Sequence, residues 1–160
     1  MNYKVQPIEV QHDAEICKVI KQVGAEYGAI GEGYGPSDPE VEMMSRFYND
    51  DSASRYFVVL VDEIIIGGAG IASFDGRDDV CELRKLFLLP ESRGLGLGKL
   101  LTEHCLEYAK SKGYKKCYLD TLNRMKGAIS LYEKLGFKHL TQPLQGTIHS
   151  SCDVWMLKKL

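Results

Sequence analysis

The segment CELRKLFLLPESRGLGLGK, residues 81–99, is the stretch from which the rest of this chain can be interpreted. It begins as a mostly apolar strand, reaches a proline at position 90, and continues into a glycine-rich turn. An amphipathic helix from Leu97 to about Lys112 follows directly. The first N–H groups of a helix lack intrahelical partners and carry partial positive charge. Because glycines 94, 96 and 98 keep side chains away from these groups, the segment predicts a site for an anion such as a pyrophosphate.

The spacing of the glycines distinguishes three known phosphate-binding designs. A P-loop requires G-x-x-x-x-G-K-[ST], but here Gly98-Lys99 is followed by Leu100, and Arg93 stands where the first glycine should be. A Rossmann fingerprint requires G-x-G-x-x-G in the first strand–helix unit, and here the third glycine comes one position early, after some eighty preceding residues. The observed pattern is R-x-x-G-x-G, carried by Arg93, Gly96 and Gly98. Taken alone, it also fits a tight strand-to-helix turn without a ligand.

Length and composition predict one globular domain spanning residues 1–160. The apolar and charged fractions, 44% and 26%, are typical of a soluble protein. A formal net charge of −2 with scattered lysines indicates neither a nucleic-acid partner nor an anionic membrane surface. Apolar runs are too short for a membrane span, and the polar N-terminus is unlike a signal peptide. We therefore expect a cytoplasmic protein.

The five cysteines are widely spaced and odd in number, at positions 17, 81, 105, 117 and 152. Because no C-x-x-C pair occurs, the spacing predicts neither a disulfide framework nor a zinc site. Several lie within apolar patterns, where a free cysteine behaves as a small core residue. We expect no metal.

Hydrophobic periodicity predicts an α/β (α+β) chain of the order β-α-α-β-β-β-α-β-α-β-β. Three hairpin-linked strands followed by βαβ units imply a mixed, mostly antiparallel sheet of about seven strands, with helices on both faces. Glycines 67, 68 and 70 lie inside an expected strand, where they mark a bulge or close packing of another backbone, and a substrate could also be that neighbour. The expected strands are 3–10, 55–62, 64–74, 81–89, 114–122, 137–141 and 152–158, and the expected helices are 13–27, one starting at 38, 97–112 and 125–135.

This order and two motifs resemble the GNAT superfamily of N-acyltransferases over nearly the whole chain. The motifs are R-x-x-G-x-G and the run AISLYEKLGF, residues 128–137, in the right order and separation. The resemblance implies a GNAT fold in which the fourth and fifth strands splay apart and hold acetyl-CoA, the cosubstrate. The backbone at Leu86, Phe87 and Leu88 would pair with the pantetheine amides. The pyrophosphate would be held by Arg93, Gly94, Leu95, Gly96, Leu97, Gly98 and Lys99.

The resemblance also implies two catalytic residues. Tyr132 stands in the place of the family's general acid, where its phenol could protonate the leaving CoA thiolate. The same tyrosine also fits the apolar face of its helix. Glu82, eleven residues before Arg93, matches a glutamate that serves as base in part of the superfamily, although it could instead pair with Arg84 or Lys85. Many members carry asparagine where this chain has Met125, so one side-chain contact to the cofactor is in doubt.

The acceptor is less well defined by the sequence. Tyr34, in the glycine-rich connection 28–38, could stack on a bound molecule, and Arg84 or Lys85 could pair with a substrate carboxylate. His149, in the late loop, could also contact the substrate. The connection 28–38 could instead be a mobile surface loop. The resemblance implies acetyl transfer to a primary amine of a small molecule or amino acid, in a ternary complex. A protein N-terminal or lysine acetyltransferase, a non-catalytic acyl-CoA-binding module and a nucleotide-binding regulatory domain are the alternatives. A homodimer is compatible with the sequence, which does not define the oligomeric state.

Overall fold

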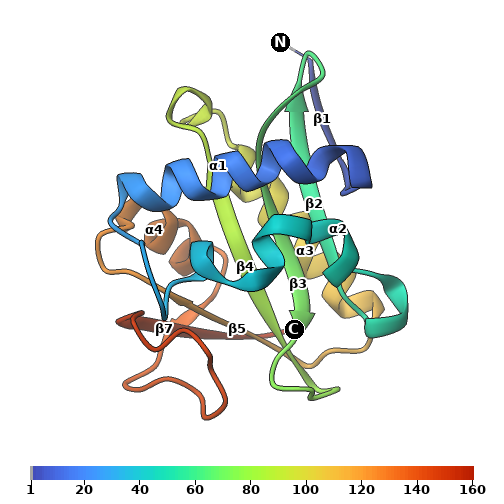
Figure 1. The fold of residues 1–160 in the computed structure, drawn as a ribbon. Helices are drawn as coiled ribbons and strands as arrows, with labels where there is room; N and C mark the ends of the chain where they lie inside the picture. Colours follow the sequence, from blue (N-terminus) through green and yellow to red (C-terminus); the bar gives the residue numbers. More distant parts are fainter. Residues whose placement is uncertain (1) are drawn as a thin grey trace.

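The computed structural model describes residues 2–160 and contains a seven-stranded sheet with helices against both faces (Figure 1). The strand order is β1-β2-β3-β4-β5-β7-β6. Only the β4–β5 pair is parallel, so the predicted fold class and order of elements are confirmed. The strands are β1 (Tyr3–Pro7), β2 (Arg55–Val61), β3 (Ile64–Ser73), β4 (Val80–Leu88), β5 (Lys116–Thr121), β6 (Lys138–His139) and β7 (Val154–Lys159). The helices are α1 (Asp13–Glu26), α2 (Met44–Phe47), α3 (Leu97–Ser111) and α4 (Lys126–Lys134).

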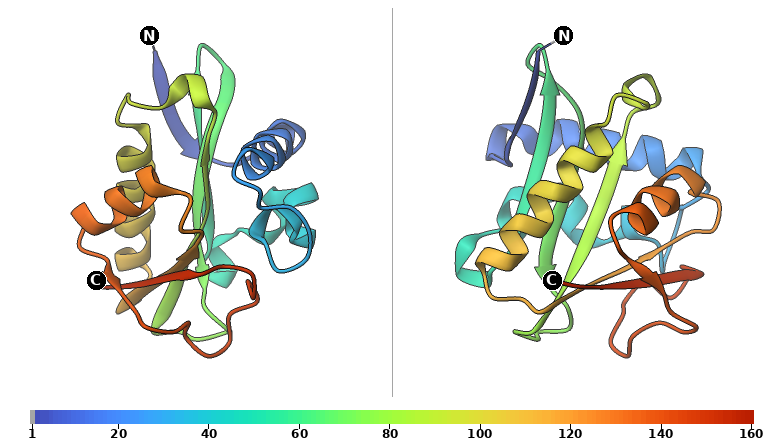
Figure 2. Two further views of the ribbon diagram at one scale, coloured as in Figure 1. Left: turned by 90° about the vertical axis from the view of Figure 1, so that its left-hand side faces the viewer. Right: turned by 180° about the vertical axis from the view of Figure 1, so that it is seen from behind.

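The helices lie in two layers, one on each side of the sheet (Figure 2). The buried side chains of α1 and α2, among them Ile16, Ile20 and Met44, pack on one face. Those of α3, including Leu101, pack on the other face together with Tyr132 of α4. Cys81, Cys105 and Cys117 are buried in this second core, as their apolar surroundings predict. Within residues 2–160, no helix has both the length and the apolar character needed to cross a bilayer.

The second predicted helix is shorter and less regular than its sequence suggests. It starts at Pro39 as a 3₁₀ helix, Pro39–Met43, and continues into the four residues of α2. Proline at the first position suits a helix start because its ring fixes φ and no N–H is lost from the hydrogen-bond ladder. The preceding connection, residues 28–34, is built of turns, in agreement with its glycine content. A further 3₁₀ turn, Gly35–Ser37, brings Asp38 toward the sheet.

Candidate active site

The strands β4 and β5 separate after three paired residues, and this separation creates the site (Figure 1). Their pairing covers Val80–Lys116, Cys81–Cys117 and Glu82–Tyr118 and then stops. The strand β4 nevertheless continues to Leu88 and β5 to Thr121. The edge of β4 beyond Glu82 therefore faces a gap instead of a neighbouring strand. This is the splayed arrangement that the resemblance predicted.

A groove extends from the gap to the start of α3. Gly94 and Gly96 in its wall have φ angles of +81° and +78°, which glycine adopts without the cost that a side chain brings. Leu100 makes the first bond of α3, to the carbonyl of Gly96, so the preceding N–H groups have no partner within the helix. The groove is lined by Val23, Tyr27, Leu86, Phe87, Leu88, Ser92, Arg93, Gly94, Gly96, Leu97, Gly98, Lys99, Met125, Gly127, Ala128 and Leu131. All the predicted cofactor residues except the exposed Leu95 are in this lining.

The two cations of the groove differ in their surroundings. The Arg93 guanidinium donates to both carboxylate oxygens of Glu26 at the end of α1, and also to the carbonyl of Leu88, at 3.0 Å. It lies over the ring of Tyr27, with 5.4 Å to the ring centroid. The Lys99 ammonium is exposed, 3.9 Å from Glu103. Binding of an anion by Arg93 therefore competes with Glu26, whereas Lys99 needs no such release.

A second, smaller cavity lies beside the groove. The two share the lining residues Leu86, Phe87 and Met125, so they are direct neighbours. All the residues predicted for catalysis and for the acceptor line this cavity: Tyr34, Glu82, Arg84, Lys85, Tyr132 and His149. The structure thus brings together side chains from β4, from α4, from the connection before the 3₁₀ turn Gly35–Ser37 and from the loop before β7.

Tyr132 reaches the cavity from α4 while its ring packs against Phe137, with centroids 5.8 Å apart. Tyr132 therefore packs in the core and also lines the cavity. The two interpretations of the sequence, a general acid and a residue of the apolar helix face, are compatible. Burial, and then the charges that Cys105 and Cys117 would carry, raise the pKa of the Tyr132 phenol. The phenol consequently keeps its proton at neutral pH and can act as a donor.

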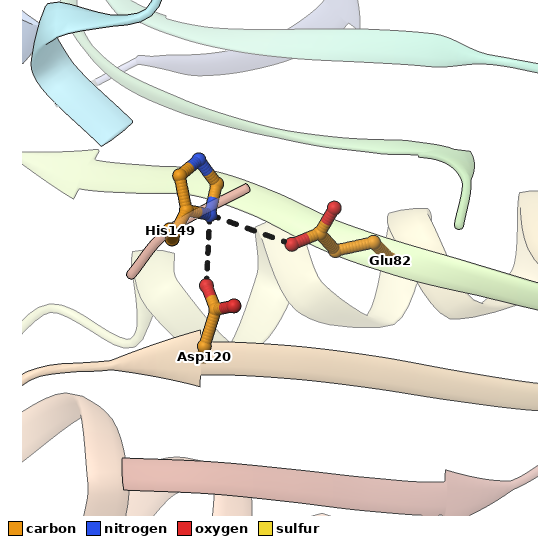
Figure 3. A group of neighbouring side chains, drawn as sticks. All are labelled: Glu82, Asp120 and His149. Atoms are coloured by element: carbon orange, nitrogen blue, oxygen red, sulfur yellow. Dashed lines mark hydrogen bonds and ion pairs between the residues drawn. The ribbon is translucent and has the colours of Figure 1, made fainter. Parts of the chain in front are cut away.

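His149 lies at the centre of a buried charge cluster (Figure 3). Its Nδ1 is 2.9 Å from Asp120 Oδ1 and 3.6 Å from Glu82 Oε2, and its Nε2 is 2.7 Å from Asp38 Oδ2. Carboxylate oxygens only accept hydrogen bonds, so both ring nitrogens act as donors and the ring is an imidazolium. Burial would lower the pKa of His149, but hydrogen bonds to Asp120, Asp38 and Glu82 outweigh it and raise the pKa to about 11. His149 is therefore a fixed cation at neutral pH.

The inward atoms of Glu82, Asp120 and His149 lie within 4.8 Å of one another, a spacing that also suits a metal ion. A metal bound there would have to displace the proton on Nδ1. A proton on Nδ1, shared with the carboxylates of Asp120 and Glu82, explains the short distances in this cluster.

Arg84 and Lys85 already have carboxylate partners. The Arg84 Nε donates to Glu82 Oε1 at 2.8 Å, and its Nη1 is 3.6 Å from Glu40. The Lys85 ammonium is 2.8 Å from Asp38 and 3.3 Å from Glu40. The sequence suggested that Glu82 is either a base or an ion-pair partner of a neighbouring cation, and its pairing with Arg84 is present. It leaves the second oxygen of Glu82 facing His149, so the pairing and a base role are compatible.

Asp38, Glu40 and Asp120 belong to this cluster but were missed in the sequence. In the sequence, Asp38 stands at the expected start of a helix, and Asp120 lies within an expected strand. A buried strand such as β5 seldom carries an aspartate without a partner, which is the one signal the sequence offered for Asp120. Met125 lies between the two cavities, and its sulfur accepts a hydrogen bond from Thr121 Oγ1 at 3.5 Å.

Comparison with known proteins places this geometry in a family. The model of the acetyltransferase (GNAT) family matches residues 26–137, more than half of the chain. The chain belongs to the GNAT family. An uncharacterized N-acetyltransferase of Escherichia coli, YjgM, is 41% identical over 155 residues, which cover 96% of this chain and 92% of that protein. This GNAT protein is accordingly an acyltransferase.

Solved structures agree with the fold of this GNAT chain. A GNAT-family acetyltransferase from Staphylococcus aureus superposes with a TM-score of 0.87 at 18% identity, covering 99% of both chains. The PaiA N-acetyltransferase of Thermoplasma acidophilum, crystallised in complex with coenzyme A, gives a TM-score of 0.78 at 20% identity, covering 100% of both chains. At these identities the likeness shows the shared fold alone.

Proposed function

We propose that the protein transfers an acetyl group from acetyl-CoA to the primary amine of a small molecule or amino acid, with both substrates bound together. The observation that carries this proposal is the junction at Leu86, Phe87 and Met125, where the groove and the acceptor cavity meet. A thioester entering from one side and an amine entering from the other would meet there, so no acyl-enzyme is needed. Coenzyme A bound by PaiA, which has the same fold, supports the nature of the cosubstrate.

The cofactor half of the site would work through the backbone. The glycine turn and the free N–H groups at the start of α3 would hold the pyrophosphate, with positive charge from Lys99 and from Arg93 once it leaves Glu26. The unpaired edge of β4 at Leu86–Leu88 would hydrogen-bond the pantetheine amides as a neighbouring strand does. Because these contacts are made by main-chain atoms, methionine at position 125 does not remove them.

The chemistry would need one base and one acid. The carboxylate of Glu82 accepts a proton from the acceptor ammonium, so the amine nitrogen can attack the thioester carbonyl carbon. The carbon–sulfur bond then breaks, and the Tyr132 phenol gives its proton to the leaving thiolate. The attacking nitrogen loses its second proton to the tyrosinate, directly or through water, which leaves a neutral amide and restores the phenol. Placing both groups around one water-poor cavity strengthens their effect on the developing charges.

The acceptor would be held between Tyr34 and the charged floor of the cavity. Since Arg84 and Lys85 already bind Glu82, Glu40 and Asp38, a substrate carboxylate would have to share one of these cations. The side of Glu82 that faces His149 offers an acceptor for the ammonium end.

Initial-rate kinetics test this proposal. Varying acetyl-CoA against a responsive amine should give intersecting double-reciprocal lines, as expected for a ternary complex. Tyr34→Ala should raise the KM of the amine and leave that of acetyl-CoA within about twofold. Parallel lines would indicate an acyl-enzyme, and release of CoA with protein substrates alone would indicate a protein acetyltransferase.

A further inference from the structure

The middle of β4 contains a strained bulge at the junction of the two cavities. Opposite β3, Arg84 pairs with Gly70 and Phe87 with Gly68, so Lys85 and Leu86 together face the single residue Ala69. Lys85 has a φ angle of +53°, in the left-handed region that normally requires glycine. A lysine in this conformation persists only where its surroundings hold it there. Lys85 lines the acceptor cavity, and Leu86 and Phe87 line both spaces.

Two contacts hold the bulge from opposite ends. The hydroxyl of Tyr56, a fully buried residue of β2, donates to the carbonyl of Lys85 at 2.8 Å. The ammonium of Lys85, with only 2% of its side chain exposed, binds Asp38 and Glu40. The bulge is therefore fastened to β2 through its backbone and to the acceptor-side segment through its side chain.

The glycines of β3 make room for the first of these contacts. A Cβ at Gly68 would lie 2.5 Å from Tyr56 Cε1, and a Cβ at Gly70 would lie 2.6 Å from Tyr56 Cδ2. The Tyr56 ring thus crosses β3 over these two residues on its way to Lys85. This contact explains glycines 68 and 70, for which the sequence left open a bulge, close packing or a neighbouring substrate.

We propose that Tyr56 is a positioning residue for acetyl transfer: its hydroxyl holds the Lys85–Leu86 bulge in the shape that presents main-chain N–H groups to the thioester carbonyl. This inference rests on the proposed function, because the thioester must lie at the junction. Fixed N–H donors stabilise the negative charge that develops on the carbonyl oxygen during attack by the amine. In a regular strand successive N–H groups alternate between the two edges, so a bulge free to relax would no longer hold these donors in fixed positions.

The variant Tyr56→Phe keeps the ring and removes only the hydroxyl. Tyr114→Phe is its matched control, since Tyr114 is also buried and donates to a backbone carbonyl, that of Ala53 at 2.9 Å, away from the cavity. Tyr56→Phe should lower kcat roughly 10- to 100-fold while the Kd of CoA stays within about twofold. Tyr114→Phe should keep kcat within about twofold at a similar loss of Tm. Equal kcat values for the two variants would overturn the proposal.

An NMR measurement separates this inference from the proposed function and does not depend on a variant that folds. In the wild-type protein, the amide signals of Lys85, Leu86 and Phe87 are compared with CoA and with acetonyl-CoA, an analogue that has a ketone in place of the thioester. The proposal expects at least one of these signals to shift further with the analogue. Identical responses to both ligands would refute it. A wild-type enzyme that acetylates no amine would instead refute the proposed function and leave this comparison intact.

Discussion

The imidazolium of His149 makes a quantitative prediction about stability. The unfolded chain holds the proton with a pKa near 6.5, whereas three carboxylates raise the folded value to about 11. Because the folded state binds this proton more tightly, its contribution is fully present below pH 6.5 and is lost as the pH rises toward 11. Between pH 6 and 8 the free energy of unfolding should fall by about 2 kcal/mol on account of this one residue. For a chain of this length that corresponds to a Tm lower by about 4–8 °C.

Urea denaturation at pH 6, 7 and 8 measures this effect, with the fluorescence of the single tryptophan, Trp155, as the signal. The variant His149→Gln cannot titrate, so its free energy of unfolding should depend on pH less than that of the wild type, by about 2 kcal/mol across this range. It should also be destabilised at pH 6 by about 3–5 kcal/mol, since three buried carboxylates lose their shared partner. His104→Gln, at a half-buried position of α3 outside the charge cluster, is the control and should follow the wild type. Parallel pH dependences of wild type and His149→Gln would refute the imidazolium assignment.

Three further predictions concern turnover and cofactor binding. Tyr132→Phe should lower kcat roughly 10²–10⁴-fold with little change in CoA affinity, measured by stopped-flow and calorimetry; an unchanged kcat would leave Tyr132 as a packing residue only. Glu82→Gln should lower kcat/KM near neutral pH and recover part of it at higher pH, where more of the amine is already deprotonated; a uniform loss at every pH would speak against a base role. Arg93→Gln should weaken CoA binding about tenfold, whereas Glu26→Gln should strengthen it a few-fold by freeing the guanidinium; equal Kd values for the two variants would contradict the competition between Glu26 and the pyrophosphate.

The cofactor half of the site could be predicted because it is local in sequence. All of its predicted residues come from one strand–turn–helix segment, and the conformational needs of Gly94 and Gly96 follow from the turn itself. The fold was predictable for a related reason. Each amphipathic helix and strand has its own period, and the hairpin turn at Asp62-Glu63, where both φ angles are positive, joins neighbouring strands.

The acceptor half could be predicted only in part, because it is assembled from distant residues. His149 was a candidate, but its partners Asp38 and Asp120 lie 111 and 29 positions away, and no local pattern pairs them. The bulge at Lys85 was equally hidden, since lysine is a poor predictor of a left-handed backbone. One contact that holds it comes from the hydroxyl of Tyr56 on another strand, and this contact becomes evident only once β2, β3 and β4 are in register.

The most direct test of the central claim is a screen of small primary amines and free amino acids for CoA release from acetyl-CoA, with mass spectrometry of the products. A panel of basic peptides is measured beside them. The account predicts that at least one small amine or amino acid drives CoA release and gains an acetyl group, and that Tyr132→Phe abolishes most of this activity. Acetylation confined to the peptides, or CoA binding with no acetyl transfer to any amine, would contradict it.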